Sequence, residues 1–77
     1  MKLGLYKHYK GNLYQVLGFA RHSETLEELV LYQALYGDYG VWVRPKAMFL
    51  EKVSYNEKEV GRFTFIAESF SKAPNVR

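Results

Sequence analysis

Short runs of apolar residues alternate with turn-forming residues along most of the chain. Residues 6–10 are rich in aromatics and end at the turn pair Gly11-Asn12, after which residues 13–21 carry apolar side chains on both sides of a pleated strand. Gly18 interrupts this run, as a bend or bulge would. The pattern predicts short strands that curve around one core.

Residues 25–36 combine the signals of two kinds of element. Thr25 followed by Glu28 is a capping-box pattern, and Gly37 is placed to end a helix. A strand is indicated by the alternation over residues 29–36, which follows the polar loop 22–28. These residues on their own leave both a strand and a helix open.

The second half of the chain predicts a turn, a strand, a helical turn and a hairpin. Residues 37–40, Gly-Asp-Tyr-Gly, suit a chain reversal, and Pro45 ends the strand that follows. Residues 45–50 predict one helical turn, from which Met48 and Phe49 plug one end of the core. The two remaining apolar runs, 51–55 and 60–66, predict a hairpin around residues 56–58.

Length and composition limit the possible classes of protein. A chain of 77 residues buries only about 60% of its unfolded surface, so it forms one domain. We expect that domain to span residues 1–66 and residues 67–77 to be a flexible tail. The absence of cysteine excludes a disulfide framework and a thiolate metal site. No apolar run approaches the ~18 residues of a membrane span, so we expect a cytoplasmic protein without membrane contact.

The net charge of +3 is unevenly distributed. Lys72 and Arg77 lie in the expected tail, and without them the chain has nine basic and eight acidic residues. A small basic cluster near the N-terminus is countered by an acidic one at residues 24–28. Charge alone therefore does not predict nucleic-acid binding.

The most distinctive stretch is LYGDYGVWVRP at residues 35–45. Together with residues 6–37, YKHYKGNLYQVLGFARHSETLEELVLYQALYG, it resembles the small bacterial family called domain of unknown function 1653. The similarity runs from Tyr6 to Phe49. It implies an all-β fold, a small Src-homology-3-like or Tudor-like barrel of about five to six strands with one short helical turn. It also favours a strand at residues 25–36, which leaves α+β with a helix there as the alternative. No substrate, cofactor or catalytic residue comes with the resemblance.

His8, His22 and Glu24 supply side chains of the kinds that bind metals. They could meet if the first two strands are neighbours, and a metal-dependent protein or enzyme is therefore one alternative. The spacing is not typical of a metal site, and His22 is better explained as a residue that orders its own loop. Ser23 has no nucleophile-elbow sequence around it. We expect no metal and no cofactor, and the sequence favours a protein that is not an enzyme.

Trp42 and Arg44 share one face of a predicted strand, while Val41 and Val43 share the other. We expect the valine face to be core and the Trp42 face to form an aromatic shelf beside a guanidinium, able to stack a planar group. The competing explanation is that both residues are framework, with Trp42 half-buried and Arg44 either covering it or pairing with Glu24. The predicted ligand site consists of Tyr36, Tyr39, Trp42, Arg44, Arg21, His22, Glu24 and Thr25.

The sequence thus favours a binding module for a peptide, a nucleic acid or a small planar ligand. A third possibility, besides the binding module and the metal-dependent protein, is a structural domain that associates with another chain through an open strand edge. We expect the protein to be a monomer or a weak homodimer.

Overall fold

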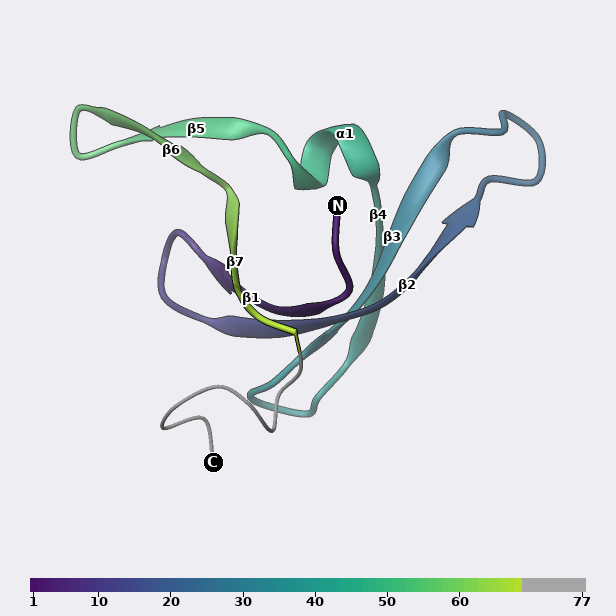
Figure 1. Cartoon of the computed structure of the whole chain (residues 1–77), viewed down its shortest axis with the longest axis horizontal. Coiled ribbons are helices and arrows are strands. Elements are labelled where there is room, and N and C mark those ends of the chain that lie inside the picture. The colour runs from purple at the N-terminus through teal and green to yellow at the C-terminus, as the bar shows by residue number, and fades with distance from the viewer. Residues whose placement is uncertain (69–77) are drawn as a thin grey trace.

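The computed structural model describes residues 1–68, and within them the protein is mainly β (Figure 1). The elements in chain order are β1 (Gly4–His8), β2 (Leu13–Arg21), β3 (Glu28–Ala34), β4 (Val41–Pro45), α1 (Lys46–Phe49), β5 (Lys52–Tyr55), β6 (Lys58–Gly61) and β7 (Phe63–Ala67). The mainly-β prediction is confirmed. Residues 28–34 form a strand, so the helical alternative at residues 25–36 is wrong.

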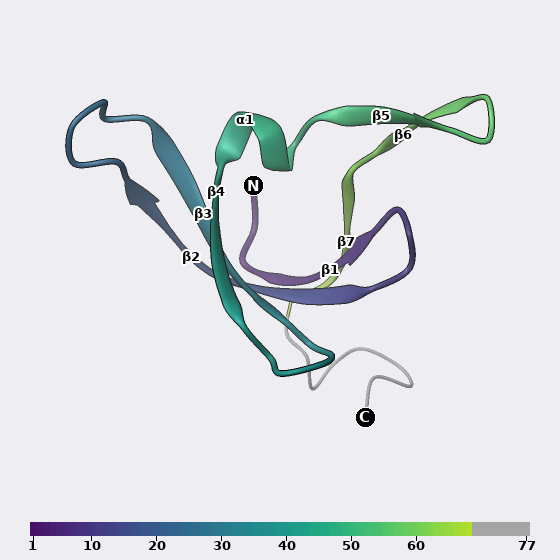
Figure 2. The ribbon, with the colours of Figure 1, turned by 180° about the vertical axis from the view of Figure 1, so that it is seen from behind.

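The strands form two antiparallel sheets and not a closed barrel. Five strands pair in the order β4-β3-β2-β1-β7, and β5 pairs only with β6. Figures 1 and 2 show α1 and the β5–β6 hairpin on the side where the five-stranded sheet stays open. The small barrel of five to six strands that the sequence predicts is therefore an open arrangement of seven strands in the described residues.

Arg62 explains why the predicted strand over residues 60–66 is two strands. Its backbone N–H donates to the carbonyl of Glu51, and its carbonyl accepts from the N–H of Tyr9. The backbone of Arg62 thus bonds to two different segments, so that β6 before it pairs with β5 and β7 after it pairs with β1. The turn between β5 and β6 holds Asn56 and Glu57 at φ of 52° and 63°, as a two-residue hairpin of the mirror-image type requires.

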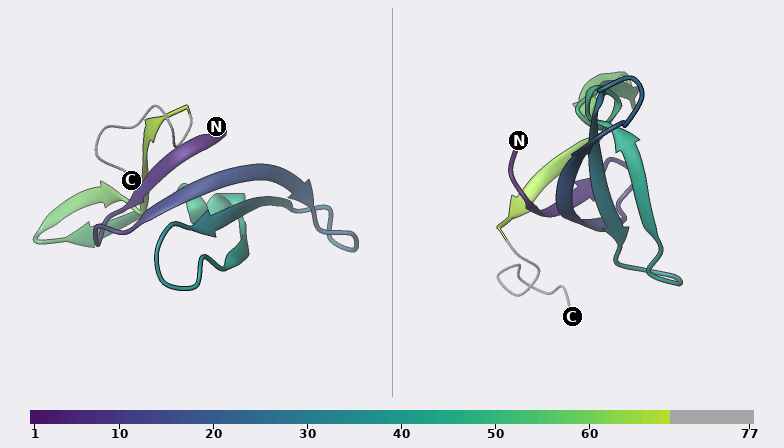
Figure 3. Two further views of the ribbon diagram at one scale, coloured as in Figure 1. Left: turned by 90° about the horizontal axis from the view of Figure 1, so that it is seen from below. Right: turned by 90° about the vertical axis from the view of Figure 1, so that its right-hand side faces the viewer.

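The long strand β2 bends where Gly18 predicts it. The pairing of β2 with β3 shifts register between Val16 and Gly18, and β2 is visibly curved in the view from below (Figure 3). The bend turns the sheet so that one face encloses the core.

The core lies on one face of the five-stranded sheet and is rich in aromatic rings. Phe49 is fully buried and stacks on Phe63 with centroids 4.0 Å apart. It also meets Tyr6 and Tyr32 edge-on, each at 5.4 Å. The helical turn α1 therefore does place Phe49 in the core, but Met48 is 44% exposed and does not plug it.

The expectation that Val41 and Val43 are core residues is wrong, since they are 53% and 57% exposed. The pairing of β4 with β3 sets Trp42 opposite Tyr32 and Arg44 opposite Val30. Tyr32 and Val30 point into the core, and side chains of directly paired residues share a face. Trp42 and Arg44 therefore lie on the core side of the sheet, and the valines lie on its outer side.

Candidate functional site

Where the core meets β4, the core face of the sheet opens into a cavity of about 240 Å³. We call it the tyrosine cavity. Its wall comes from the start of β2, from β3 and the turn after it, and from β4. The residues that line it are Tyr14, Tyr32, Tyr36, Trp42 and Arg44. One indole, three phenols and one guanidinium thus surround a single space.

Arg44 is the charged group of the tyrosine cavity. Its Nε–H donates to the Tyr32 hydroxyl at 3.3 Å, which fixes the plane of the guanidinium beside a buried ring. Two ion pairs occur among residues 1–68, Lys46 with Glu28 and Arg62 with Glu51, and Arg44 belongs to neither. A partly buried guanidinium that no carboxylate of the described residues neutralises is suited to binding an anion.

The tyrosine hydroxyls form the polar rim of the cavity. The hydroxyls of Tyr14 and Tyr36 are hydrogen-bonded at 2.6 Å, and their rings meet edge-on with centroids 5.6 Å apart. Burial raises the pKa of Tyr14, and the bond to Tyr36 raises it further. The phenol therefore stays protonated and remains a hydrogen-bond donor or acceptor around neutral pH.

His8 lies next to Tyr14, with ring centroids 6.3 Å apart. Burial lowers the pKa of His8, and the positive charges of Arg62, Lys10 and Arg44 lower it further. Its Nδ1 accepts the backbone N–H of Lys10 at 3.2 Å. The imidazole is thus neutral near pH 7, and it senses a positive field that a bound anion would reduce.

The other predicted site residues do not line this cavity. Tyr39 sits in the turn before β4 at φ 58°, where its carbonyl accepts from the Gln33 side chain. Arg21 lines a different cavity with Phe19, Ala20 and Glu28. The remaining predicted residues, His22, Glu24 and Thr25, lie in the β2–β3 loop. There the His22 Nδ1 accepts the backbone N–H groups of the other two, at 3.1 and 3.4 Å.

The fold does not bring His8, His22 and Glu24 together. His8 ends β1 beside the start of β2, whereas His22 follows the end of β2, and a strand of nine residues separates its ends by about 25 Å. Among the described residues there is no group of three or more His, Cys, Asp or Glu side chains able to hold a metal. The antiparallel pairing of β1 with β2 is the reason, because it sets the two histidines at opposite ends.

Tyr14 and Tyr32 are cavity residues that sequence reasoning missed. Both lie on the same face as Trp42, because Tyr32 pairs with Trp42 and Val16, two residues after Tyr14, pairs with Tyr32. The period-two spacing of Tyr14 and Val16 indicates that their side chains share a face. The register that aligns β2 with β3 could not be predicted from the sequence, since the bulge near Gly18 shifts it.

These features define a small, mainly β protein with an aromatic cavity on the core side of an open antiparallel sheet. The chain belongs to the family of proteins of unknown function DUF1653, whose sequence profile matches residues 4–65. A crystal structure of a protein from Bordetella bronchiseptica that belongs to DUF1653 is similar over 86% of this chain and 87% of that one, with 35% identity and a TM-score of 0.79. No curated protein matches the chain. Within the described residues, no helix has the length and apolar character needed to cross a membrane.

Proposed function

We propose that this protein is a binding module whose tyrosine cavity accepts a planar group that carries a negative charge. The observation that carries the proposal is Arg44, a guanidinium held beside the Tyr32 ring and left without a carboxylate among residues 1–68. Trp42 and Tyr36, which are 59% and 43% exposed, supply ring faces next to this charge. A planar anion would use both the rings and the charge.

Fluorescence of Trp42 tests the proposal, because this is the only tryptophan and it lines the cavity. Three probes separate its parts: thymidine monophosphate is planar and anionic, thymidine is planar and neutral, and inorganic phosphate is anionic without a ring. We expect thymidine monophosphate to bind more tightly than either of the others.

Two variants localise the binding. Arg44→Gln should weaken the binding of thymidine monophosphate by about 10- to 150-fold, because a hydrogen bond to a charged group contributes about 1.5–3 kcal/mol. Arg21→Gln, a cation changed at a different cavity, should leave the affinity unchanged and is the matched control. Equal affinity of wild type and Arg44→Gln for thymidine monophosphate would overturn the proposal, as would equal binding of thymidine.

A second candidate function is self-association through β4. This strand is the last in its sheet and carries the exposed Val41 and Val43. Unpaired backbone groups on a sheet edge can pair with the same edge of another copy. Light scattering tests this directly: the mass of two chains in the wild type and of one chain in Val43→Lys would favour self-association, and a monomer at high concentration would exclude it.

A cytoplasmic location stays a prediction from the sequence.

A further inference from the structure

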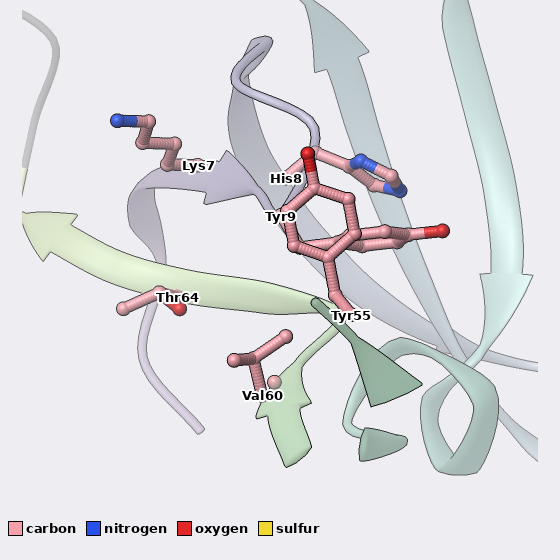
Figure 4. Close-up of a pocket in the computed structure, with 7 residues that line it drawn as sticks. Lys7, His8, Tyr9, Tyr55, Val60 and Thr64 are labelled. Atoms are coloured by element: carbon pink, nitrogen blue, oxygen red, sulfur yellow. The ribbon is translucent and has the colours of Figure 1, made fainter. Parts of the chain in front are cut away.

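A second cavity, of about 220 Å³, lies between β1 and the β5–β6 hairpin (Figure 4). We call it the hairpin cavity. It is lined by Lys7, His8, Tyr9, Tyr55, Val60 and Thr64 among others. Figure 4 shows the rings of His8, Tyr9 and Tyr55 gathered on one side of it. Its wall is therefore also aromatic, and it has a cation, Lys7, where the tyrosine cavity has Arg44.

A continuous series of ring contacts joins the two cavities. From the tyrosine cavity the contacts run from Tyr36 to Tyr14 at 5.6 Å, on to His8 at 6.3 Å, to Tyr9 at 4.5 Å and to Tyr55 at 5.2 Å between centroids. We call these five residues the aromatic row. Tyr55 at its far end is 43% exposed, like Tyr36 at its near end. The row thus links the tyrosine cavity to the hairpin cavity.

Cations lie along the aromatic row, and the acidic residue next to its far end is Glu57 in the β5–β6 turn. Arg44 is at one end, and the Lys10 ammonium lies 5.8 Å from the centre of the Tyr9 ring. At the other end Lys58 pairs directly with Tyr55 and so shares its face, whereas Glu59 pairs with Ser54 and lies on the opposite face.

Among residues 1–68, no carboxylate lines either cavity. Glu51 is held by Arg62, and the Asp38 carboxylate accepts the backbone N–H of Gly40. The acidic residues Glu24, Glu27 and Glu28 belong to the far end of β2. The row therefore favours an anionic polymer over a basic peptide.

We propose that the aromatic row is one extended binding site for single-stranded nucleic acid, with one base in each cavity and the phosphates near Arg44, Lys10 and Lys58. The inference rests on the proposed function and lengthens that site beyond one planar anion. Aromatic rings that alternate with cations are the physical means by which proteins bind single strands without reading their sequence, because every base has a ring face. The bases of a duplex are already stacked on each other and do not offer these faces.

The test compares a hexathymidylate with thymidine monophosphate, both followed by Trp42 fluorescence. We expect the hexamer to bind more tightly, and Tyr55→Ala to weaken the hexamer by about 5- to 150-fold while leaving the monophosphate unchanged. Phe19→Ala removes an exposed ring far from the row and is the matched control. With three phosphates contacted, the logarithm of the hexamer affinity should fall against the logarithm of salt with a slope of about −2.

Each outcome decides one of the two claims. If the hexamer binds no more tightly than the monophosphate, or if Tyr55→Ala has no effect on it, the extended site is wrong and the proposed function stands. If the hexamer depends on Tyr55 while the monophosphate does not bind, the extended site stands and the proposed function is wrong. If an acidic or proline-rich peptide binds in a way that depends on Tyr55 and the hexamer does not bind, the nucleic-acid assignment is wrong. Circular dichroism of Tyr55→Ala checks that the variant is folded.

Discussion

The core cluster around Phe49 and the aromatic row are two groups of rings that differ in what surrounds them. In the core cluster, Phe49 touches Tyr6, Tyr32 and Phe63, and its side chain has no exposed surface. In the aromatic row, Tyr36 contacts Tyr14 and Tyr55 contacts Tyr9, yet Tyr36 and Tyr55 are each 43% exposed. Aromatic content beyond what the core needs is thus arranged at its border, where ring faces stay available to a ligand.

The largest expected effect is on the core cluster. Phe49→Ala should lower the free energy of unfolding by about 3–5 kcal/mol, because it removes a buried ring that contacts three others. A domain of this size has about 4–12 kcal/mol in total, so the variant will be close to unfolded. Urea denaturation followed by circular dichroism measures the change. A loss below 1 kcal/mol would mean that Phe49 is not central to the core.

A matched pair of valines separates the two faces of the sheet. Val30 is fully buried whereas Val43 is 57% exposed, and they lie on adjacent strands. Val30→Ala should lower the free energy of unfolding by about 1–3 kcal/mol, whereas Val43→Ala should change it by no more than about 0.5 kcal/mol. The difference in urea midpoint between the two variants is the readout. Equal losses would place Val43 in a core, as its sequence pattern first predicts.

Two tyrosine hydroxyls extend the comparison to hydrogen bonds. The Tyr6 hydroxyl donates to the Lys2 carbonyl at 2.6 Å at the edge of the core, so Tyr6→Phe should cost about 1 kcal/mol. The bond between the Tyr36 and Tyr14 hydroxyls is exposed, and Tyr36→Phe should cost less because water replaces it. Thermal unfolding of both variants measures this; a larger loss for Tyr36→Phe would show that the row is framework.

The smallest expected effect is a pH dependence from His8. Burial and the nearby cations hold its pKa in the folded protein below the ordinary value of about 6.5. The unfolded chain therefore binds more protons between these two values, and stability falls as the pH falls through about 6.5 until the lower pKa is reached. The urea midpoint should follow this course and flatten in His8→Gln. A midpoint that rises on acidification would contradict the burial of His8.

A bound anion should act on His8 in the opposite direction. Negative charge near Arg44 offsets the positive field that lowers the pKa of His8, so thymidine monophosphate should raise that pKa. Proton NMR of the imidazole with and without the ligand checks this, and Arg44→Gln is the control in which the ligand-induced rise should shrink.

The local parts of the fold could be predicted from the sequence better than its closure. The chain bends at Gly18, turns at Gly37 and ends a strand at Pro45. The sequence predicts all three features because these residues act through their own backbone. Closure depends on pairings between distant segments, and nothing local at Arg62 indicates that its backbone would split one predicted strand between two sheets.

The candidate site shows the same division. The shared face of Trp42 and Arg44 follows from strand periodicity, and both line one cavity with Tyr36. Tyr14 and Tyr32 join them through cross-strand register. The β2–β3 loop was included in the predicted site because polar residues in loops often bind, but a strand of nine residues carries it away from the cavity.

The most direct test of a ligand site in the tyrosine cavity is a nitrogen–proton NMR titration with thymidine monophosphate. The account predicts saturable shifts of the Trp42 indole N–H and the backbone amides of Tyr36 and Arg44, while the amides of His22, Glu24 and Thr25 stay in place. Shifts confined to those three loop residues would move the site to the β2–β3 loop. A spectrum unchanged at millimolar ligand would contradict a planar-anion site in this protein.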